Sequence, residues 1–229
     1  MNEYILEMDN VSFGYRDGSK KRMILKELSY SFEKGRFYTI LGPSGSGKTT
    51  LLSMISALDV PESGSIRYED KELKKIGYGK YRRNHMAIIF QKYNLIDYLT
   101  GLENVEANMD IAKNKFTGNR KEIAYKILST MGIVKTKADR RVTKLSGGEQ
   151  QRIAIARALA KDVDLILGDE PTGSLDTATS NEVIDLFKHL ASEYGKTIIL
   201  VTHSDDVAAK SDISLRIEDG KLRQFKEEK

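Results

Sequence analysis

A glycine-rich segment, residues 42–49 (GPSGSGKT), separates two stretches of different periodicity and constrains the fold of this chain more than any other feature. Residues 37–41 before it form a short, mostly apolar run, which is typical of a strand buried on both faces. Residues 49–58 after it carry apolar side chains at helical spacing, namely Leu51, Leu52, Ile55 and Leu58. A buried strand that enters a helix through a tight loop predicts an α/β fold.

The glycine-rich segment matches the P-loop pattern, in which two glycines frame four residues and Lys-Thr or Lys-Ser follows. Its glycines let backbone N–H groups converge on phosphate oxygens, and the helix that follows adds partial positive charge there. Lys48 is expected to reach the β- and γ-phosphates, and Thr49 to offer its hydroxyl to Mg²⁺. A plain glycine turn would not explain the Lys-Thr pair. The expected ATP-binding residues of this loop are Gly42, Ser44, Gly45, Ser46, Gly47, Lys48, Thr49 and Thr50.

A second apolar run, residues 165–170 (LILGDE), ends in two carboxylates. Adjacent acids at a strand end are costly unless a cation lies nearby. Beside a P-loop on the same sheet, Asp169 is expected to hold Mg²⁺ and Glu170 to polarise the water that attacks the γ-phosphate. Taken alone, an exposed acid pair in a loop would be the simpler interpretation.

The segment LSGGE at residues 145–149 continues into a helix-like run, residues 150–159. Ser146 can cap that helix, with Glu149 as the reciprocal partner three residues later. Gly147 and Gly148 open the backbone to a close approach by a phosphate. The segment resembles the signature motif of ABC ATPases, and this resemblance implies that it faces the γ-phosphate bound by the P-loop of a second subunit.

Further positions match the family in the same order along the chain. Tyr15 resembles the aromatic residue that stacks on adenine, although packing against Phe13 is the alternative. Gln91 resembles the glutamine that joins the Mg²⁺ site to the helical lobe. Asp176 resembles the acidic residue of the loop that crosses the dimer interface, and His203 the switch histidine on the γ-phosphate. The resemblance therefore implies catalytic roles for Glu170, His203 and Lys48, and metal ligation by Thr49, Gln91 and Asp169.

Residues 90–96, 102–105 and 171–176 resemble one branch of the family. That branch serves lipoprotein release, macrolide and antimicrobial-peptide export or sensing, and a cell-division complex. One position departs from the family pattern: Gly168 stands where bulkier residues are common, and we expect it to loosen the local packing without removing activity.

The order of predicted elements indicates a P-loop NTPase with a RecA-like core. Loosely alternating residues near the N-terminus predict an antiparallel β sub-lobe, and helical patterns at residues 121–131 and 149–160 predict an inserted α-helical sub-lobe. We expect one ABC ATPase domain over residues 1–229, with the helical sub-lobe at about 92–160.

Composition bears on location and partners. The chain has no cysteine and a net charge of +4, which is small for a nucleic-acid binder, so no nucleic acid is expected as a partner. The basic run at residues 20–22 is interpreted as a solvated loop, with a place near acidic lipids as the alternative. Without an apparent signal peptide or membrane span, the chain is expected in the cytoplasm, bound to the inner face of the membrane through an integral-membrane permease.

The resemblance also implies a mechanism: two copies associate around ATP and Mg²⁺, and hydrolysis loosens the dimer. The main alternative is a regulatory ATPase of a cell-division-type complex that controls a cell-wall hydrolase without transport. DNA-repair members of the family carry a long coiled coil that is not seen here, and translation members usually carry two ATPase units. The motif at Ser146 disfavours a generic P-loop kinase.

Overall fold

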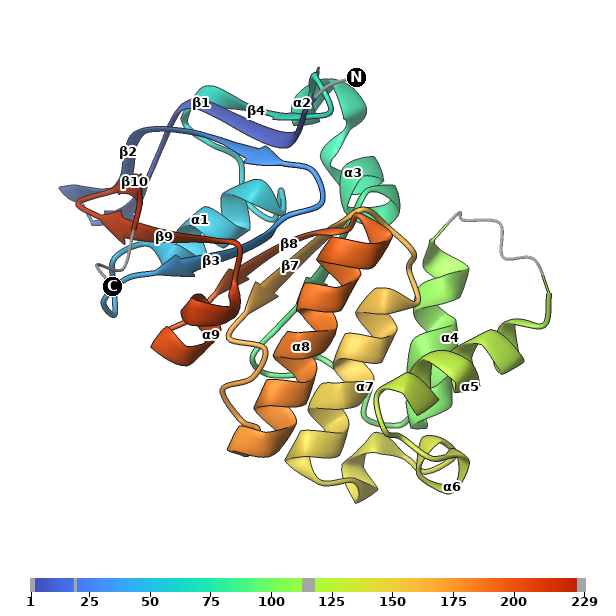
Figure 1. Cartoon of the computed structure of the whole chain (residues 1–229). Coiled ribbons are helices and arrows are strands. Elements are labelled where there is room, and N and C mark those ends of the chain that lie inside the picture. Colours follow the sequence, from blue (N-terminus) through green and yellow to red (C-terminus); the bar gives the residue numbers. More distant parts are fainter. Residues whose placement is uncertain (1–2, 19, 113–117, 226–229) are drawn as a thin grey trace.

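The computed structural model describes residues 3–18, 20–112 and 118–225 (Figure 1). An antiparallel sheet of order β2-β1-β4-β5 is built from β1 (Tyr4–Asp17), β2 (Lys20–Glu33), β4 (Ser63–Tyr68) and β5 (Lys71–Glu72). This sheet is the antiparallel sub-lobe that the alternating N-terminal pattern predicts. The basic run at residues 20–22, however, begins β2 and is not a loop. The side chains of Lys21 and Arg22 are tolerated in a strand because they are exposed at this end of the hairpin with β1.

A second sheet of order β10-β9-β3-β8-β7-β6 forms the core of the molecule. Its strands β3 (Phe37–Leu41), β8 (Thr197–Val201), β7 (Leu165–Asp169), β6 (Met86–Ile89) and β9 (Ile213–Glu218) run parallel to their neighbours. Only β10 (Lys221–Gln224) pairs antiparallel, with β9. Strands β3, β7 and β8 are buried on both faces almost throughout, which explains their mostly apolar sequences.

The parallel strands contribute side chains to two separate apolar cores, because successive side chains of a strand point to opposite faces of the sheet. Tyr38, Ile40, Ile199 and Val201 pack with α1 (Lys48–Ile55) and the antiparallel sheet. Phe37, Ile198 and Leu200 pack on the other face, against α7 (Gly147–Leu159) and α8 (Thr177–Tyr194). Helix α1 thus lies between the two sheets, and α7 and α8 cover the outer face of the core sheet (Figure 1).

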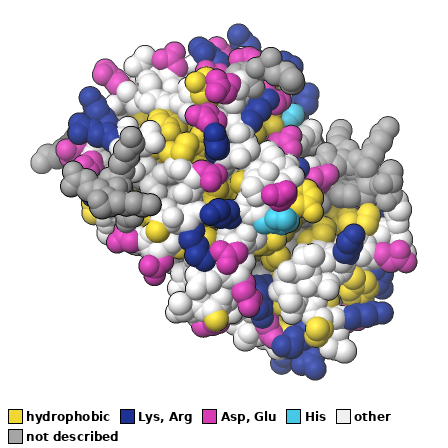
Figure 2. All heavy atoms as spheres, in the orientation of Figure 1, with side chains coloured by type: hydrophobic (Ala, Val, Ile, Leu, Met, Phe, Trp, Pro, Cys, Tyr) yellow, Lys and Arg dark blue, Asp and Glu magenta, His cyan; other side chains and the backbone are white. Residues whose placement is uncertain are grey.

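The helices between residues 101 and 159 gather on one side of the molecule (Figure 1). They are α4 (Gly101–Ile111), α5 (Arg120–Thr130), α6 (Lys135–Ala138), a 3₁₀ turn (Val142–Lys144) and α7. The remaining helices are α2 (Leu73–Ile76), α3 (Tyr78–Asn84) and α9 (Asp205–Lys210). Figure 2 shows acidic and basic side chains interspersed over one face of the molecule.

One element boundary differs from the sequence prediction. The helix after the glycine-rich loop ends at Ile55, because Ala57 adopts a left-handed backbone, and Leu58 is half exposed instead of continuing the apolar stripe. Helix α8 begins at Thr177. The carboxylate of Asp176 caps it by accepting from the backbone N–H of Thr179.

Gly168 does not loosen its surroundings, contrary to the expectation from sequence. A Cβ at this position would lie 2.6 Å from Cδ2 of Leu200 and 3.3 Å from Cγ of Pro171. Leu200 is fully buried on the neighbouring strand and fills the space that a larger residue would need. The glycine therefore permits tight packing between β7 and β8.

Helix α7 begins with the predicted capping box. The Ser146 hydroxyl accepts from the N–H of Glu149, whose carboxylate accepts from the N–H of Ser146 at 2.9 Å. Lys137 also pairs with the Glu149 carboxylate at 2.5 Å. The Lys137 ammonium, and then the Ser146 N–H, hold the pKa of Glu149 below its ordinary value.

This box makes a pH-dependent prediction for Glu149→Ala. The carboxylate stabilises the folded chain fully at neutral pH, and its contribution disappears as the pH falls through the lowered pKa of Glu149. We expect the variant to lose about 1 kcal/mol of unfolding free energy at pH 7. The difference from the unmodified chain should shrink in acid, as measured by urea denaturation at several pH values. An equal difference at pH 7 and pH 3.5 (about one unit below the ordinary range) would contradict this assignment.

Gly168→Ala tests the packing between β7 and β8. Overpacking a filled core costs about 1–3 kcal/mol, so the melting temperature should fall by about 2–12 °C for a chain of this length. Gly79→Ala in α3 is the matched control, because a Cβ there meets no atom within 4 Å. Calorimetry should show the control unchanged or slightly stabilised. If Gly168→Ala melts like the control, Leu200 does not fill this space.

Candidate functional site

The candidate site lies where parallel strands end. The glycine-rich loop follows β3, the acid pair ends β7, and His203 follows β8. These three strands are neighbours in the order β3-β8-β7, with β6 and then Gln91 next along. Ligand sites in open parallel sheets form at the carboxyl ends of the strands. Segments up to about 160 residues apart in the chain therefore meet at one edge of the sheet.

A cleft of about 320 Å³ opens at this edge. It brings together most of the predicted phosphate and metal residues with Glu170 and His203. It also contains Arg22 and Ile24, which sequence reasoning did not place in the site. Their position depends on how β2 crosses the glycine-rich loop, and no local motif reveals that. The lining residues are Arg22, Ile24, Ser44, Gly45, Gly47, Lys48, Thr49, Thr50, Asp169, Glu170 and His203.

The loop backbone is shaped to expose N–H groups. Gly45 and Gly47 have φ of 76° and 103°, values that favour glycine. A Cβ on Gly47 would lie 2.8 Å from Cγ2 of Ile24, so β2 presses closely on the loop. Gly47 is the N-cap of α1, and no side chain caps the helix there. The N-terminal N–H groups of α1 thus remain available for an anion.

Lys48 is buried at the bottom of this loop. Its ammonium donates to the carbonyl oxygens of Gly42 at 2.6 Å and Pro43 at 3.0 Å. Burial lowers the pKa of Lys48, and the carboxylates of Glu170 and Asp169 oppose that shift. These contacts place the ammonium inside the glycine-rich loop. A phosphate in the loop would replace the two carbonyl oxygens as the acceptor for the ammonium.

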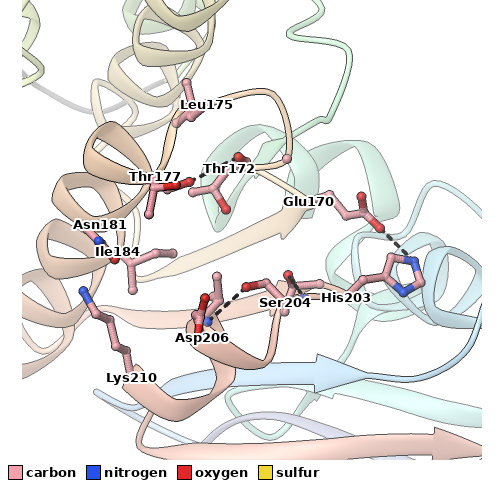
Figure 3. A pocket seen from close by; sticks show the side chains of 14 residues that line it. Glu170, Thr172, Leu175, Thr177, Asn181, Ile184, His203, Ser204, Asp206 and Lys210 are labelled. Carbon is pink, nitrogen blue, oxygen red and sulfur yellow. Dashed lines mark hydrogen bonds and ion pairs between the residues drawn. The ribbon is translucent and has the colours of Figure 1, made fainter.

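The Glu170 carboxylate lies between two side chains from other strands. Its Oε1 is 3.0 Å from Nε2 of His203, and its Oε2 accepts from the Gln91 amide at 3.3 Å (Figure 3 shows the His203 contact). Glu170 has a φ of 47°, a left-handed value that is costly for a residue with a side chain. Its N–H nevertheless donates to Val201 at 2.9 Å, which fixes this turn against β8. The two carboxylate oxygens therefore contact side chains that follow two different strands, β8 and β6.

Asp169 differs from Glu170 in its environment. Burial, and next the negative charge of Glu170, raise the pKa of Asp169, while Lys48 and His203 lower it. A nearby divalent cation would stabilise the ionised carboxylate of Asp169, because its positive charge offsets both the burial and the negative charge of Glu170. Thr49 lines the same cleft, and the amide of Gln91 reaches Glu170 beside it. Hydroxyl, carboxylate and amide oxygens suit Mg²⁺, which commonly uses few protein ligands together with phosphate oxygens.

Several predicted site residues are not in the cleft. Tyr15 is half exposed on β1 and packs edge-on against Phe13, with ring centroids 5.2 Å apart. The Asp176 carboxylate accepts from Thr179, which lowers the pKa of Asp176. The segment comprising Ser146, Gly147, Gly148 and Glu149 begins α7 and does not line the cleft either. Their roles toward ATP stay predictions.

The structure also shows a connection that sequence reasoning missed. Arg157 of α7 donates to the carbonyl oxygens of Tyr93, at 2.9 Å, and of Asn94. Both residues have positive φ, and they follow Gln91 closely. Arg157 thus ties the segment after Gln91 to the helix that carries the LSGGE segment. A long-range contact of this kind has no signal in the sequence.

Comparison with known proteins agrees with this geometry. A family model described as "ABC transporter" matches residues 25–173. An ABC transporter ATP-binding protein of Bacillus subtilis, YclH, is 43% identical over 94% of both chains. The macrolide export ATP-binding/permease protein MacB of Burkholderia thailandensis is 38% identical over 97% of this chain, which spans 34% of that protein.

The solved structures point the same way. The dimeric ABC transporter cassette MJ0796, from Methanocaldococcus jannaschii, superposes with a TM-score of 0.90 at 36% identity, covering 96% of this chain and 98% of that one. A second MJ0796 structure, in a post-hydrolysis state with ADP and Pi, gives a TM-score of 0.89 at 35% identity and the same coverage. Among the residues that the structure describes, no helix is long and apolar enough to cross a membrane. With the P-loop, the acid pair and His203 meeting in one cleft, the chain belongs to the ABC transporter family, as an ATP-binding cassette that hydrolyses ATP.

Proposed function

We propose that this chain powers a membrane transporter of the lipoprotein, macrolide or antimicrobial-peptide type through ATP-driven association of two copies. One observation carries the proposal. The cleft holds the P-loop, the acid pair and His203, whereas the LSGGE segment of the same chain lies outside it. Ser146 and Gly147 are exposed at the start of α7, so a second copy can present them to the nucleotide.

The capping box supports this role for α7. Ser146 and Glu149 satisfy each other and leave the small, exposed Gly147 as the place of close approach. The Tyr93 hydroxyl would lie 2.9 Å from a Cβ on Gly147, so a larger residue at this position would collide with Tyr93. The MJ0796 cassette, similar over nearly its full length, is dimeric in both structures. ATP held between two such chains would bridge them, because neither chain alone neutralises the negative charge of its phosphates.

The site residues take the following roles in the proposal. Lys48 and the loop N–H groups bind the β- and γ-phosphates, with Ser44, Gly45, Ser46 and Thr50 completing the loop. Glu170 accepts a hydrogen bond from the attacking water, and His203 donates to the γ-phosphate instead of to Glu170. Thr49, Asp169 and Gln91 are the residues that would hold Mg²⁺, which when bound neutralises developing charge on the phosphates.

A second cleft is the proposed binding site for the membrane partner. It has a volume of about 200 Å³ and lies beside the segment after Gln91. Phe90, Ile96 and Ile111 contribute apolar side chains to it, and Arg157 lines it as well. Arg157 also donates hydrogen bonds to the carbonyl oxygens of Tyr93 and Asn94. A protein bound in this cleft would therefore be affected by movement of the loop after Gln91.

The partner in this proposal is an integral-membrane permease, which keeps a cytoplasmic chain at the inner face of the membrane. The name of MacB describes an ATP-binding and permease protein in one chain, and this chain spans 34% of its length. We propose that residues 1–229 form one ABC ATPase domain with a helical sub-lobe at about 92–160, and that this domain acts together with the permease.

Glu170→Gln tests the role of the carboxylate in hydrolysis. The amide keeps the size of the side chain but cannot accept a proton, so ATP should still bind while turnover falls at least about 100-fold. With Mg-ATP the variant should elute as a dimer in size-exclusion chromatography and persist longer than the unmodified chain. A variant that hydrolyses ATP at the normal rate would remove Glu170 from the chemistry.

Capture from native membranes tests the proposed partner. Tagged Glu170→Gln chain with Mg-ATP should retain a permease, identified by mass spectrometry, and a second substitution, Ile96→Asp, should release it without lowering ATP affinity. Recovery of a permease together with a cell-wall hydrolase would favour the regulatory alternative over transport. Recovery of only soluble proteins or nucleic acid, or equal recovery with Ile96→Asp, would contradict a permease bound at this cleft.

A further inference from the structure

Two neighbouring basic side chains at the start of β2 have different surroundings. The ammonium of Lys21 pairs with the carboxylate of Glu62. The side chain of Arg22 instead lines the nucleotide cleft, together with Ile24 and Lys48. Successive side chains of a strand point to opposite faces, which separates the two cations although they are adjacent in sequence. The basic run is therefore not one uniformly solvated patch.

The register of β1 and β2 places Arg22 beside Tyr15. Tyr15 and Arg22 are directly paired across the two strands. Side chains paired in this way project from the same face, with Cβ atoms about 5 Å apart. Arg22 thus belongs to the end of the site where Tyr15 is predicted to meet adenine. The groups that act on the γ-phosphate, among them Glu170 and His203, come from the strand ends of the other sheet.

The guanidinium of Arg22 is available for a ligand. Within the ranges that the structure describes, its side chain takes part in no ion pair or hydrogen bond. Lys48, by contrast, already donates to Gly42 and Pro43. A triphosphate carries several negative charges, and the planar guanidinium matches phosphate oxygens with two parallel donors. Its exposure to solvent limits the gain, since water screens such contacts.

We propose that Arg22 binds the α- and β-phosphates of the nucleotide and sets nucleotide affinity without acting on the bond that breaks. The inference rests on the nucleotide site proposed above and adds a residue to it. ATP and ADP share both phosphates, so the contact stabilises substrate and product equally. An interaction of this uniform kind alters KM and leaves kcat unchanged.

The test is a fluorescence titration of the full-length chain with ATP and with ADP, in Mg²⁺, at low and high salt. Arg22→Ala should weaken both nucleotides about 5–10-fold, the range of a partly screened charge-assisted hydrogen bond. KM should rise by the same factor, with kcat within about twofold. Arg22→Lys should recover part of the affinity and Arg22→Gln little of it. The loss should diminish at high salt.

Lys21→Ala is the matched control, since it removes the same charge from the adjacent residue outside the cleft. It should bind nucleotide normally, and an equal loss in both variants would overturn the proposal. Weakened ATP binding with unchanged ADP binding would also overturn it, because the contact would then be to the γ-phosphate. Arg22→Gln and Arg22→Lys provide the measurement if Arg22→Ala does not fold.

Lys48→Ala separates this inference from the proposed function. If Lys48→Ala loses ATP binding while Arg22→Ala does not, the nucleotide site stands and the role of Arg22 fails. If neither substitution alters nucleotide affinity, the nucleotide site itself is wrongly placed, and the inference about Arg22 fails with it.

Discussion

The candidate site depends on the parallel arrangement of β3, β8 and β7, whose carboxyl ends lie side by side. Each strand is buried on both faces, so its ends are the only places where its polar continuation can reach solvent or a ligand. The glycine-rich loop, the acid pair and His203 are those continuations. Tight packing keeps the edge aligned, as the contact between Gly168 and Leu200 illustrates.

Strain and charge at this edge are balanced by contacts between strands. Glu170 has a left-handed backbone, and Asp169 is partly buried beside it with a raised pKa. The Val201 carbonyl holds the Glu170 N–H, and His203 and Gln91 hold its carboxylate. Two of these three contacts use side chains that a bound nucleotide is proposed to recruit. Nucleotide binding would then exchange contacts within the chain for contacts with phosphate, which is a physical basis for a switch.

The helical side of the molecule is joined to this edge through a short segment. Gln91 touches Glu170, and the next few residues are clamped by Arg157 of α7. Helix α7 in turn begins with Ser146 and the exposed Gly147. The nucleotide cleft, the segment after Gln91 and the helix that carries the LSGGE segment are thus linked by contiguous contacts.

Local sequence determined the parts of the site that are continuous in the chain. Residues 42–49, the acid pair and the capping box at Ser146 carry their own signals, since spacing, turn chemistry and capping act over a few residues. Only the tertiary structure decided which of them meet. The strand order places His203 and Gln91 on Glu170. The path of β2 brings Arg22 to the cleft, and the LSGGE segment stays outside it. These outcomes depend on pairing between residues far apart in the chain, and no short pattern encodes them.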